Sequence, residues 1–209
     1  MNDDVTPFIA AAGLVAAIVL TTKKRRLPDS VAAPDSYPTV AQIERAIVGM
    51  LASEHASRAP ALVRTVARSV HEACALEGLD PALLLASGYT ESRFNPQAVS
   101  RINALGIWQQ LPQYGQYYAD ACWDNAQRRP RCSWGQVAQR PQEAEIYAND
   151  VPQAARIAAR HFAYLIRKYG TFEEGICRYA AGGRGAGCAA GRDYMERLKE
   201  RMEWARSFF

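Results

Sequence analysis

The sequence predicts an all-α fold, and three observations point to it. Of the 209 residues, 49% are hydrophobic, and alanine is abundant while runs of β-branched residues are scarce. That composition favours helices over strands. Apolar residues recur in several segments with a period of about 3.6 residues. Helix-start and helix-stop signals bound the same segments, and the length suits one domain with an additional tail.

In the first half of the chain, the apolar period predicts three helices, over residues 39–53, 60–77 and 81–92. Gly78 ends the second helix in the usual C-terminal manner. Asp80 is a good N-cap for the third, with Pro81 at its first helical position. The third helix is apolar on nearly all sides, so we expect it in the middle of the domain. Gly88 within it predicts that another group packs closely there.

The second half begins with a polar and aromatic stretch, residues 113–148, in which we expect irregular structure. Asp150 and Pro152 then start a helix that reaches Tyr169. The pattern Thr171-x-x-Glu174 is a capping box, which starts the next helix. A glycine-rich loop follows, and the last helix runs from about residue 192 to residue 207. No strand alternation of useful length occurs.

The N-terminal segment contains an apolar stretch, Phe8–Leu20, followed by basic residues at 23–26. The stretch falls short of the ~20 residues that span a bilayer as a helix, although its neighbours extend it. Asp3 and Asp4 precede it, which reverses the charge pattern of a secretory signal peptide. Under the positive-inside rule the C-terminal side faces the cytoplasm. We expect a membrane-associated helix, delivered in a particle such as a phage or inserted as a non-standard signal anchor; an apolar helix buried on a partner is the alternative.

Composition divides the chain into three parts: an apolar segment over residues 1–26, a proline-containing linker over 27–40, and a helical domain over 41–209. The formal net charge is +4. This charge suits attraction to an anionic polymer, but it is equally explained by solubility.

The five cysteines contain no CxxC pair and no metal-ligand spacing with the three histidines, so we expect no metal site. Cys122 with Cys132, and Cys177 with Cys188, each bracket a short polar segment. These pairs are candidate disulfides that leave Cys74 on an apolar helix face. Five free thiols in a reducing compartment are the alternative.

The first candidate catalytic residue is Glu91, in the last turn of the apolar third helix. Burial and the partial negative charge of a helix C-terminus both raise a carboxyl pKa. A glutamic acid that stays protonated near neutral pH is what acid-catalysed glycoside cleavage requires. Arg93 opposes this effect if it points inward. The alternative is a surface glutamate at a helix end.

The stretch after Glu91 carries a family pattern. Residues 91–112 read ESRFNPQAVSRINALGIWQQLP. They resemble the soluble lytic transglycosylase (SLT) family of the lysozyme-like superfamily, which includes goose-type lysozyme. The positions in register are Glu91, Ser92, Pro96, Ala98, Ser100, Gly106, Gln109 and Pro112. A second block, Arg178–Gly182, resembles the family's Ala-Tyr-Asn-Ala-Gly, and Tyr194 matches a tyrosine that opens the last helix.

The resemblance implies a helical lysozyme-like domain that cleaves peptidoglycan between N-acetylmuramic acid and N-acetylglucosamine, forming a 1,6-anhydro ring without a cofactor. Glu91 is then the single catalytic acid, and Ser92 orients it or holds the substrate's N-acetyl group. Gln109 lines the sugar groove, Tyr179 bonds near Glu91, and Tyr194 is a further candidate for substrate binding.

Two of the departures from the family pattern bear on function. Ala180 replaces an asparagine, and Trp108 replaces a methionine, where it either stacks on a sugar or fills the core. The polar stretch suggests a glycan-contacting lid, with Tyr114, Tyr117, Tyr118, Trp123 and Trp134 as aromatic contacts and Arg128, Arg129 and Arg131 as carboxylate contacts. A solvated basic loop is the alternative for the arginines.

Three functions follow as alternatives. The first is a lytic transglycosylase for local wall penetration by a phage virion or an envelope-spanning apparatus. It acts in the periplasm or cell envelope, held to the membrane through Phe8–Leu20 and with no specific nucleic acid as partner. The second is a hydrolytic lysozyme of the same fold. The third is a catalytically weak structural or channel component of a virion or secretion machine, for which Ala180 is the best support.

Overall fold

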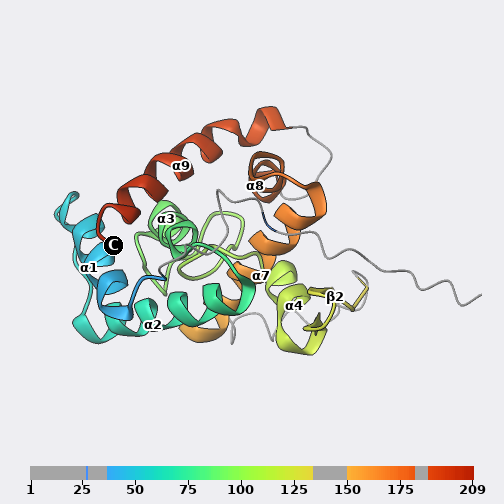
Figure 1. The fold of residues 1–209 in the computed structure, drawn as a ribbon, viewed down its shortest axis with the longest axis horizontal. Helices are drawn as coiled ribbons and strands as arrows, with labels where there is room; N and C mark the ends of the chain where they lie inside the picture. Colours follow the sequence, from blue (N-terminus) through green and yellow to red (C-terminus); the bar gives the residue numbers. More distant parts are fainter. Residues whose placement is uncertain (1–26, 28–36, 134–149, 182–187) are drawn as a thin grey trace, which may run out of the picture.

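The computed structural model describes residues 27, 37–133, 150–181 and 188–209 (Figure 1). The apolar stretch Phe8–Leu20, residues 28–36 of the expected linker, and Trp134 lie outside these residues. The described part is mostly helical, which confirms the predicted all-α fold class. None of its helices combines the length and the apolar character needed to cross a membrane.

Two helices open the domain at the expected positions. Helix α1 spans Val40–Ala52, and Thr39 and Gln42 form a reciprocal capping box at its start. Helix α2 spans Pro60–Glu77 and ends at Gly78, which adopts the left-handed conformation that favours glycine.

Helix α3, Pro81–Ser92, lies in the centre of the domain. The Asp80 side chain accepts a hydrogen bond from the Ala82 backbone N–H and so caps the helix. Residues 81–89 are all buried. Helix α9 crosses one side of α3 and α2 runs along another (Figure 1). A Cβ atom added at Gly88 would lie 3.0 Å from the Phe94 ring, so the close approach expected there is confirmed.

The C-terminal half supplies three more long elements. Helix α7 spans Val151–Tyr169 and packs on α2 and α8. Helix α8 spans Phe172–Ala180, and the Thr171 hydroxyl accepts from the Glu174 N–H, which is one half of the predicted capping box. The Glu174 carboxylate accepts from Arg178 instead of closing the other half. A short 3-10 turn, η2 (Cys188–Gly191), leads into α9, Arg192–Arg206.

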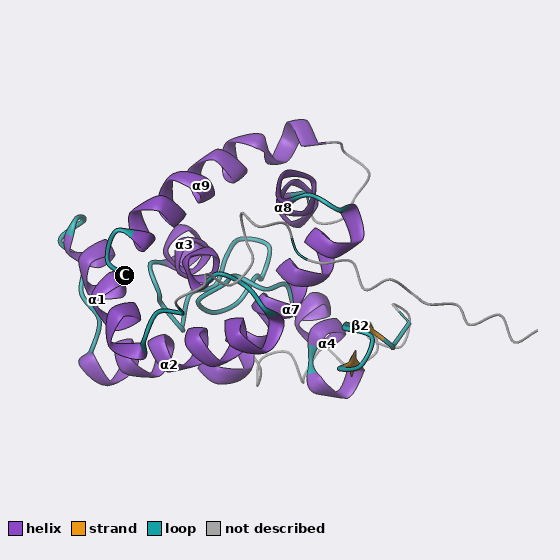
Figure 2. Ribbon diagram, viewed as in Figure 1, coloured by secondary structure: helices purple, strands orange, loops and turns teal. Residues whose placement is uncertain are grey.

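The expectation of irregular structure after residue 112 is wrong for part of the stretch. Pro112–Tyr118 form helix α4, and a 3-10 turn, η1 (Asp120–Cys122), follows it. Strands β1 (Trp123–Asp124) and β2 (Arg129–Pro130) then pair as a minimal antiparallel hairpin. Pro112 occupies the first helical position and is a helix-start signal. The prediction missed it because the following residues are polar and aromatic without an apolar period. We call residues 112–132 the arm; Figure 2 shows it beside α7, on the opposite side of the molecule from α1.

The cysteines pair as the sequence suggested. The structure joins Cys122 to Cys132 across the arm and Cys177 to Cys188 between α8 and η2. Cys74 is a free, buried thiol on α2.

Candidate active site

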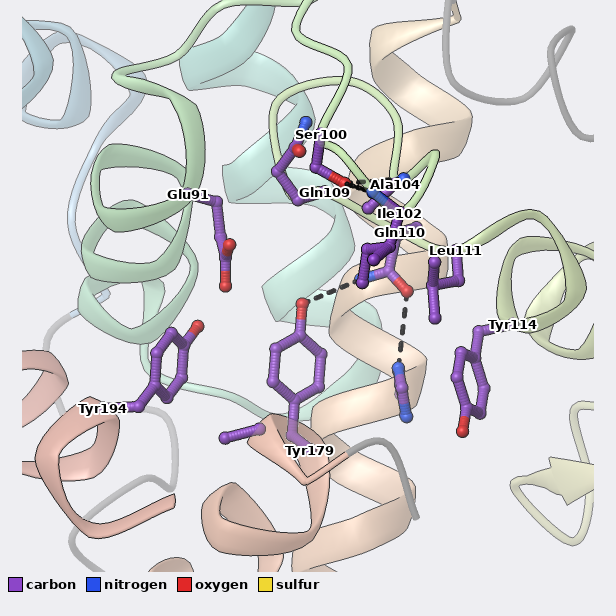
Figure 3. A pocket seen from close by; sticks show the side chains of 12 residues that line it. Glu91, Ser100, Ile102, Ala104, Gln109, Gln110, Leu111, Tyr114, Tyr179 and Tyr194 are labelled. Carbon is purple, nitrogen blue, oxygen red and sulfur yellow. Dashed lines mark hydrogen bonds between the residues drawn. The ribbon is translucent and has the colours of Figure 1, made fainter. Parts of the chain in front are cut away.

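A pocket of about 400 Å³ opens between α3, α8 and α9 on one side and the segment 100–114 on the other (Figure 3). Its polar lining residues are Glu91, Ser100, Gln109, Gln110, Tyr114, His161, Tyr179 and Tyr194. Its apolar lining residues are Ile102, Ala104, Leu111 and Ala180. Glu91 is the only carboxylic acid among the described residues that line it.

Glu91 projects into the pocket from the last turn of α3 (Figure 3). Burial raises the pKa of its carboxyl above the ordinary value, against smaller opposing effects of a hydrogen bond from Tyr194 and the charge of Arg197. Arg93 does not contribute, because its guanidinium pairs with Glu54 at the surface. The carboxyl therefore has the environment of a general acid.

Two tyrosines stand on the side of the pocket facing Glu91. The Tyr194 hydroxyl points towards the Glu91 carboxyl (Figure 3). The Tyr179 hydroxyl instead donates to the carbonyl oxygen of Trp108 at 3.1 Å and accepts from Gln110. Tyr194, rather than Tyr179, is thus the tyrosine that bonds to Glu91. Ser87, one turn before Glu91 on α3, lies 3.4 Å from the Tyr194 hydroxyl.

Gln109 shapes the loop over residues 98–109, which forms the other wall of the pocket. Its side-chain Nε2 donates to the carbonyl oxygens of Ala98 and Gly106, and its backbone has a positive φ of 45°. Gln109 lines the pocket as expected. Its amide nitrogen is nevertheless used to hold the loop, and the side-chain oxygen has no hydrogen-bond partner among the described residues.

Two residues predicted to bind substrate do not line the pocket. Trp108 is only 1% exposed, and its indole N–H donates to the carbonyl oxygen of Leu84. Of the two alternatives for Trp108, the structure shows core packing, because a buried ring has no face to offer a sugar. The Ser92 hydroxyl donates to the Ile107 carbonyl and accepts from the Asn95 N–H, so it fixes the turn after α3.

Of the aromatic residues expected to form a glycan-contacting lid, one lines the pocket and others are buried in the core. Tyr114 lines the pocket, while Tyr118 and Trp123 are buried in a small cluster with Tyr117 and Tyr164 at its edge. The arginines bind protein groups: Arg128 lies 3.7 Å from a Glu77 carboxylate oxygen, and Arg131 donates to the Ala121 carbonyl. Arg129, on β2, is exposed and lies outside the pocket lining.

Sequence reasoning missed Gln110 and His161. Gln110 adjoins a motif position but matches none, and His161 sits on the buried face of α7 like any core residue. The His161 Nδ1 lies 3.4 Å from the Gln110 Oε1, and burial lowers the pKa of His161 to about 3. In the part of the chain that the structure describes, no cluster of three or more His, Cys, Asp or Glu side chains suits a metal ion.

The sequence of this site-bearing region matches a family model, the transglycosylase SLT domain, over residues 68–201. This range is more than half of the chain and contains Glu91, Tyr179 and Tyr194. The chain belongs to the transglycosylase SLT domain family. Membership confirms the resemblance found in the motifs and supports a lytic transglycosylase-type function acting on peptidoglycan. No curated protein matches the chain.

Proposed function

We propose that this SLT-family chain cleaves the β-1,4 bond between N-acetylmuramic acid and N-acetylglucosamine and releases a 1,6-anhydro product. The observation that carries the proposal is a partly buried Glu91 with a raised pKa, in a pocket whose other described lining residues are neutral. Burial extends to higher pH the range in which this carboxyl holds a proton, and that proton can pass to the glycosidic oxygen.

One carboxyl is sufficient for this reaction. After the leaving sugar takes the proton from Glu91, the resulting carboxylate accepts the proton of the muramoyl C6 hydroxyl, whose oxygen attacks C1 and closes the ring. The nucleophile belongs to the substrate, so its effective concentration is high and no second carboxylate has to activate water. A hydrolase with two carboxylates flanking the bond has a different arrangement.

The biological setting is a separate part of the proposal. The apolar stretch Phe8–Leu20 and the reversed charges around it support a membrane-associated protein of the periplasm or cell envelope, or one carried in a phage virion. There it would open the wall locally, beside other virion or secretion-apparatus proteins. Ala180 in the pocket lining keeps a catalytically weak structural role as the competing proposal.

Digestion of purified sacculi by wild type and Glu91→Gln tests the chemistry. We expect the variant to lose activity by roughly 10²–10⁴-fold, the usual contribution of a general acid. Glu196→Gln, a change at an exposed carboxylate on α9, is the matched control and should act like wild type. Equal clearing by wild type and Glu91→Gln, or no clearing by either, contradicts the enzymatic proposal.

Mass spectrometry of the digest separates the two enzymatic outcomes. An anhydro product is lighter by one water than the product of hydrolysis. Reducing-end products in place of anhydro products would identify a lysozyme.

A further inference from the structure

Gln110 and His161 form a hydrogen-bonded chain along the side of the pocket away from Glu91. The chain runs from His161 on α7 through Gln110 to Tyr179 on α8, and it ends at the carbonyl oxygen of Trp108 (Figure 3). The mechanism proposed above uses neither Gln110 nor His161. Their arrangement nevertheless determines which hydrogen-bonding atoms the pocket offers to a ligand.

The direction of every bond in this chain follows from its last member. A backbone carbonyl can only accept, so the Tyr179 hydroxyl must donate its proton to Trp108, at 3.1 Å. The Tyr179 oxygen is then an acceptor, and the Gln110 atom that contacts it at 3.1 Å must be the nitrogen, Nε2. The Gln110 Oε1 therefore faces His161, whose Nδ1 must carry the hydrogen.

His161 is well placed to fix the orientation of the Gln110 amide. Its ring stacks on Tyr118 at a centroid distance of 4.4 Å and on Tyr114 at 5.2 Å. The ring is buried and stays neutral, so one nitrogen donates while the other does not. The Gln110 amide thus keeps one orientation.

This orientation leaves a donor on the pocket wall. An amide nitrogen has two hydrogens, and Tyr179 takes one of them. Gln110 lines the pocket, and its neighbours there include two aliphatic side chains, Ile102 and Leu111. Ile102 is 70% exposed, although it is a large apolar side chain. A neutral N–H donor beside apolar side chains matches a group that combines a carbonyl oxygen with a methyl.

We propose that Gln110, oriented by His161, donates its second amide hydrogen to the carbonyl oxygen of a sugar's 2-acetamido group, whose methyl packs on Ile102 and Leu111. The proposal rests on the proposed function, because it assigns a recognition element to that same site. Gln110 touches the substrate in this scheme, and His161 is a positioning residue that acts through Gln110.

Binding of two neutral trisaccharides tests the proposal, with calorimetry on full-length Glu91→Gln protein to prevent turnover. Chitotriose carries acetamido groups, and cellotriose has hydroxyls in their place. We expect tighter binding of chitotriose. Adding Gln110→Met should weaken chitotriose binding roughly fivefold to tenfold, the size of one hydrogen bond between neutral groups, and leave cellotriose binding unchanged.

Two substitutions of nearly equal size separate positioning by His161 from mere packing. His161→Asn retains an N–H donor where Nδ1 stands and should keep the preference for chitotriose, whereas His161→Leu should lose it. Arg68→Ala, on the exposed face of α2 away from the pocket lining, is the control for general effects. Circular dichroism and the thermal midpoint verify that each variant is folded.

Three results overturn the inference: no preference for chitotriose before Gln110 is changed, an equal loss of affinity for both sugars in Gln110→Met, or equal behaviour of His161→Asn and His161→Leu. The outcome is independent of the digestion experiment. A protein that prefers chitotriose but leaves sacculi intact refutes the proposed enzyme while retaining the acetamido site, and the reverse result refutes the acetamido site alone.

Discussion

Helix α3 and the arm carry opposite ends of the pocket, and different interactions hold them. Helix α3, which bears Glu91, is held by apolar packing: Leu83, Leu84 and Leu85 are all 0% exposed. The arm, which bears Tyr114, buries few aliphatic side chains and is held by polar, aromatic and covalent links.

The links of the arm converge on α7 and α2. The Arg160 guanidinium of α7 pairs with Asp120 at 2.6 Å, donates to the Tyr118 carbonyl and lies over the Trp123 ring. On the other side, Arg128 at the hairpin lies near the buried Glu77 of α2. The comparison teaches that the acid end of the pocket depends on the hydrophobic core, while the far end depends on a few specific links that can be broken one at a time.

The largest expected effect on stability comes from the core. Leu84→Ala should lower the free energy of unfolding by about 3 kcal/mol, because it removes buried methyl groups and leaves a cavity under α3. Urea denaturation measures this change, and the two ends of the pocket should unfold together. Leu76→Ala is the matched control, since Leu76 is 59% exposed on α2 and its truncation should have little effect. A similar loss in both variants would contradict the assignment of α3 as the core element.

A smaller and more local effect is expected from the arm. Replacing both Cys122 and Cys132 by serine should cost roughly 2–3 kcal/mol, the chain-entropy value for a loop of this length. Hydrogen exchange should show faster exchange in the arm while α3 remains protected. The corresponding Cys177→Ser, Cys188→Ser variant should leave exchange in the arm unaltered. If α3 loses protection as much as the arm does, the two regions are not independent.

The smallest effect concerns the pH dependence at the acid end. A general acid works while protonated, so activity should fall as pH rises through the pKa of Glu91. The hydrogen bond from Tyr194 lowers that pKa, so Tyr194→Phe should raise it and move the alkaline limb of kcat/KM to higher pH. Tyr179→Phe is the control, because the Tyr179 proton goes to the Trp108 carbonyl and the limb should stay in place. Movement to lower pH in Tyr194→Phe would contradict the assigned donor.

Sequence reasoning predicted the helical framework well because its boundaries are encoded locally. Asp80 with Pro81, and Thr171 with Glu174, act within one turn of the helices they start. Gly78 and Gly170 end helices with left-handed backbone angles that glycine adopts readily. Helix α4 was missed because only Pro112 signals its start and no apolar period supports it.

The site was predicted less completely, because pocket walls are assembled from distant segments. The motif located Glu91, Gln109, Tyr179 and Tyr194, which all line the pocket. It also selected Ser92 and Trp108, whose side chains turn to backbone groups instead. His161 and Gln110 are 51 positions apart in the sequence, and no local sequence pattern predicts that they come into contact.

The pairing of four cysteines in disulfides gives Cys74 a use in the laboratory. Its thiol is 0% exposed, and burial holds its pKa well above the ordinary value, so the thiolate that alkylating reagents require is nearly absent in the folded protein. Labelling of oxidised protein must therefore wait until α2 separates from its neighbours. The rate of mass increase with a maleimide thus reports how often the core opens, and the native chain needs no engineered probe.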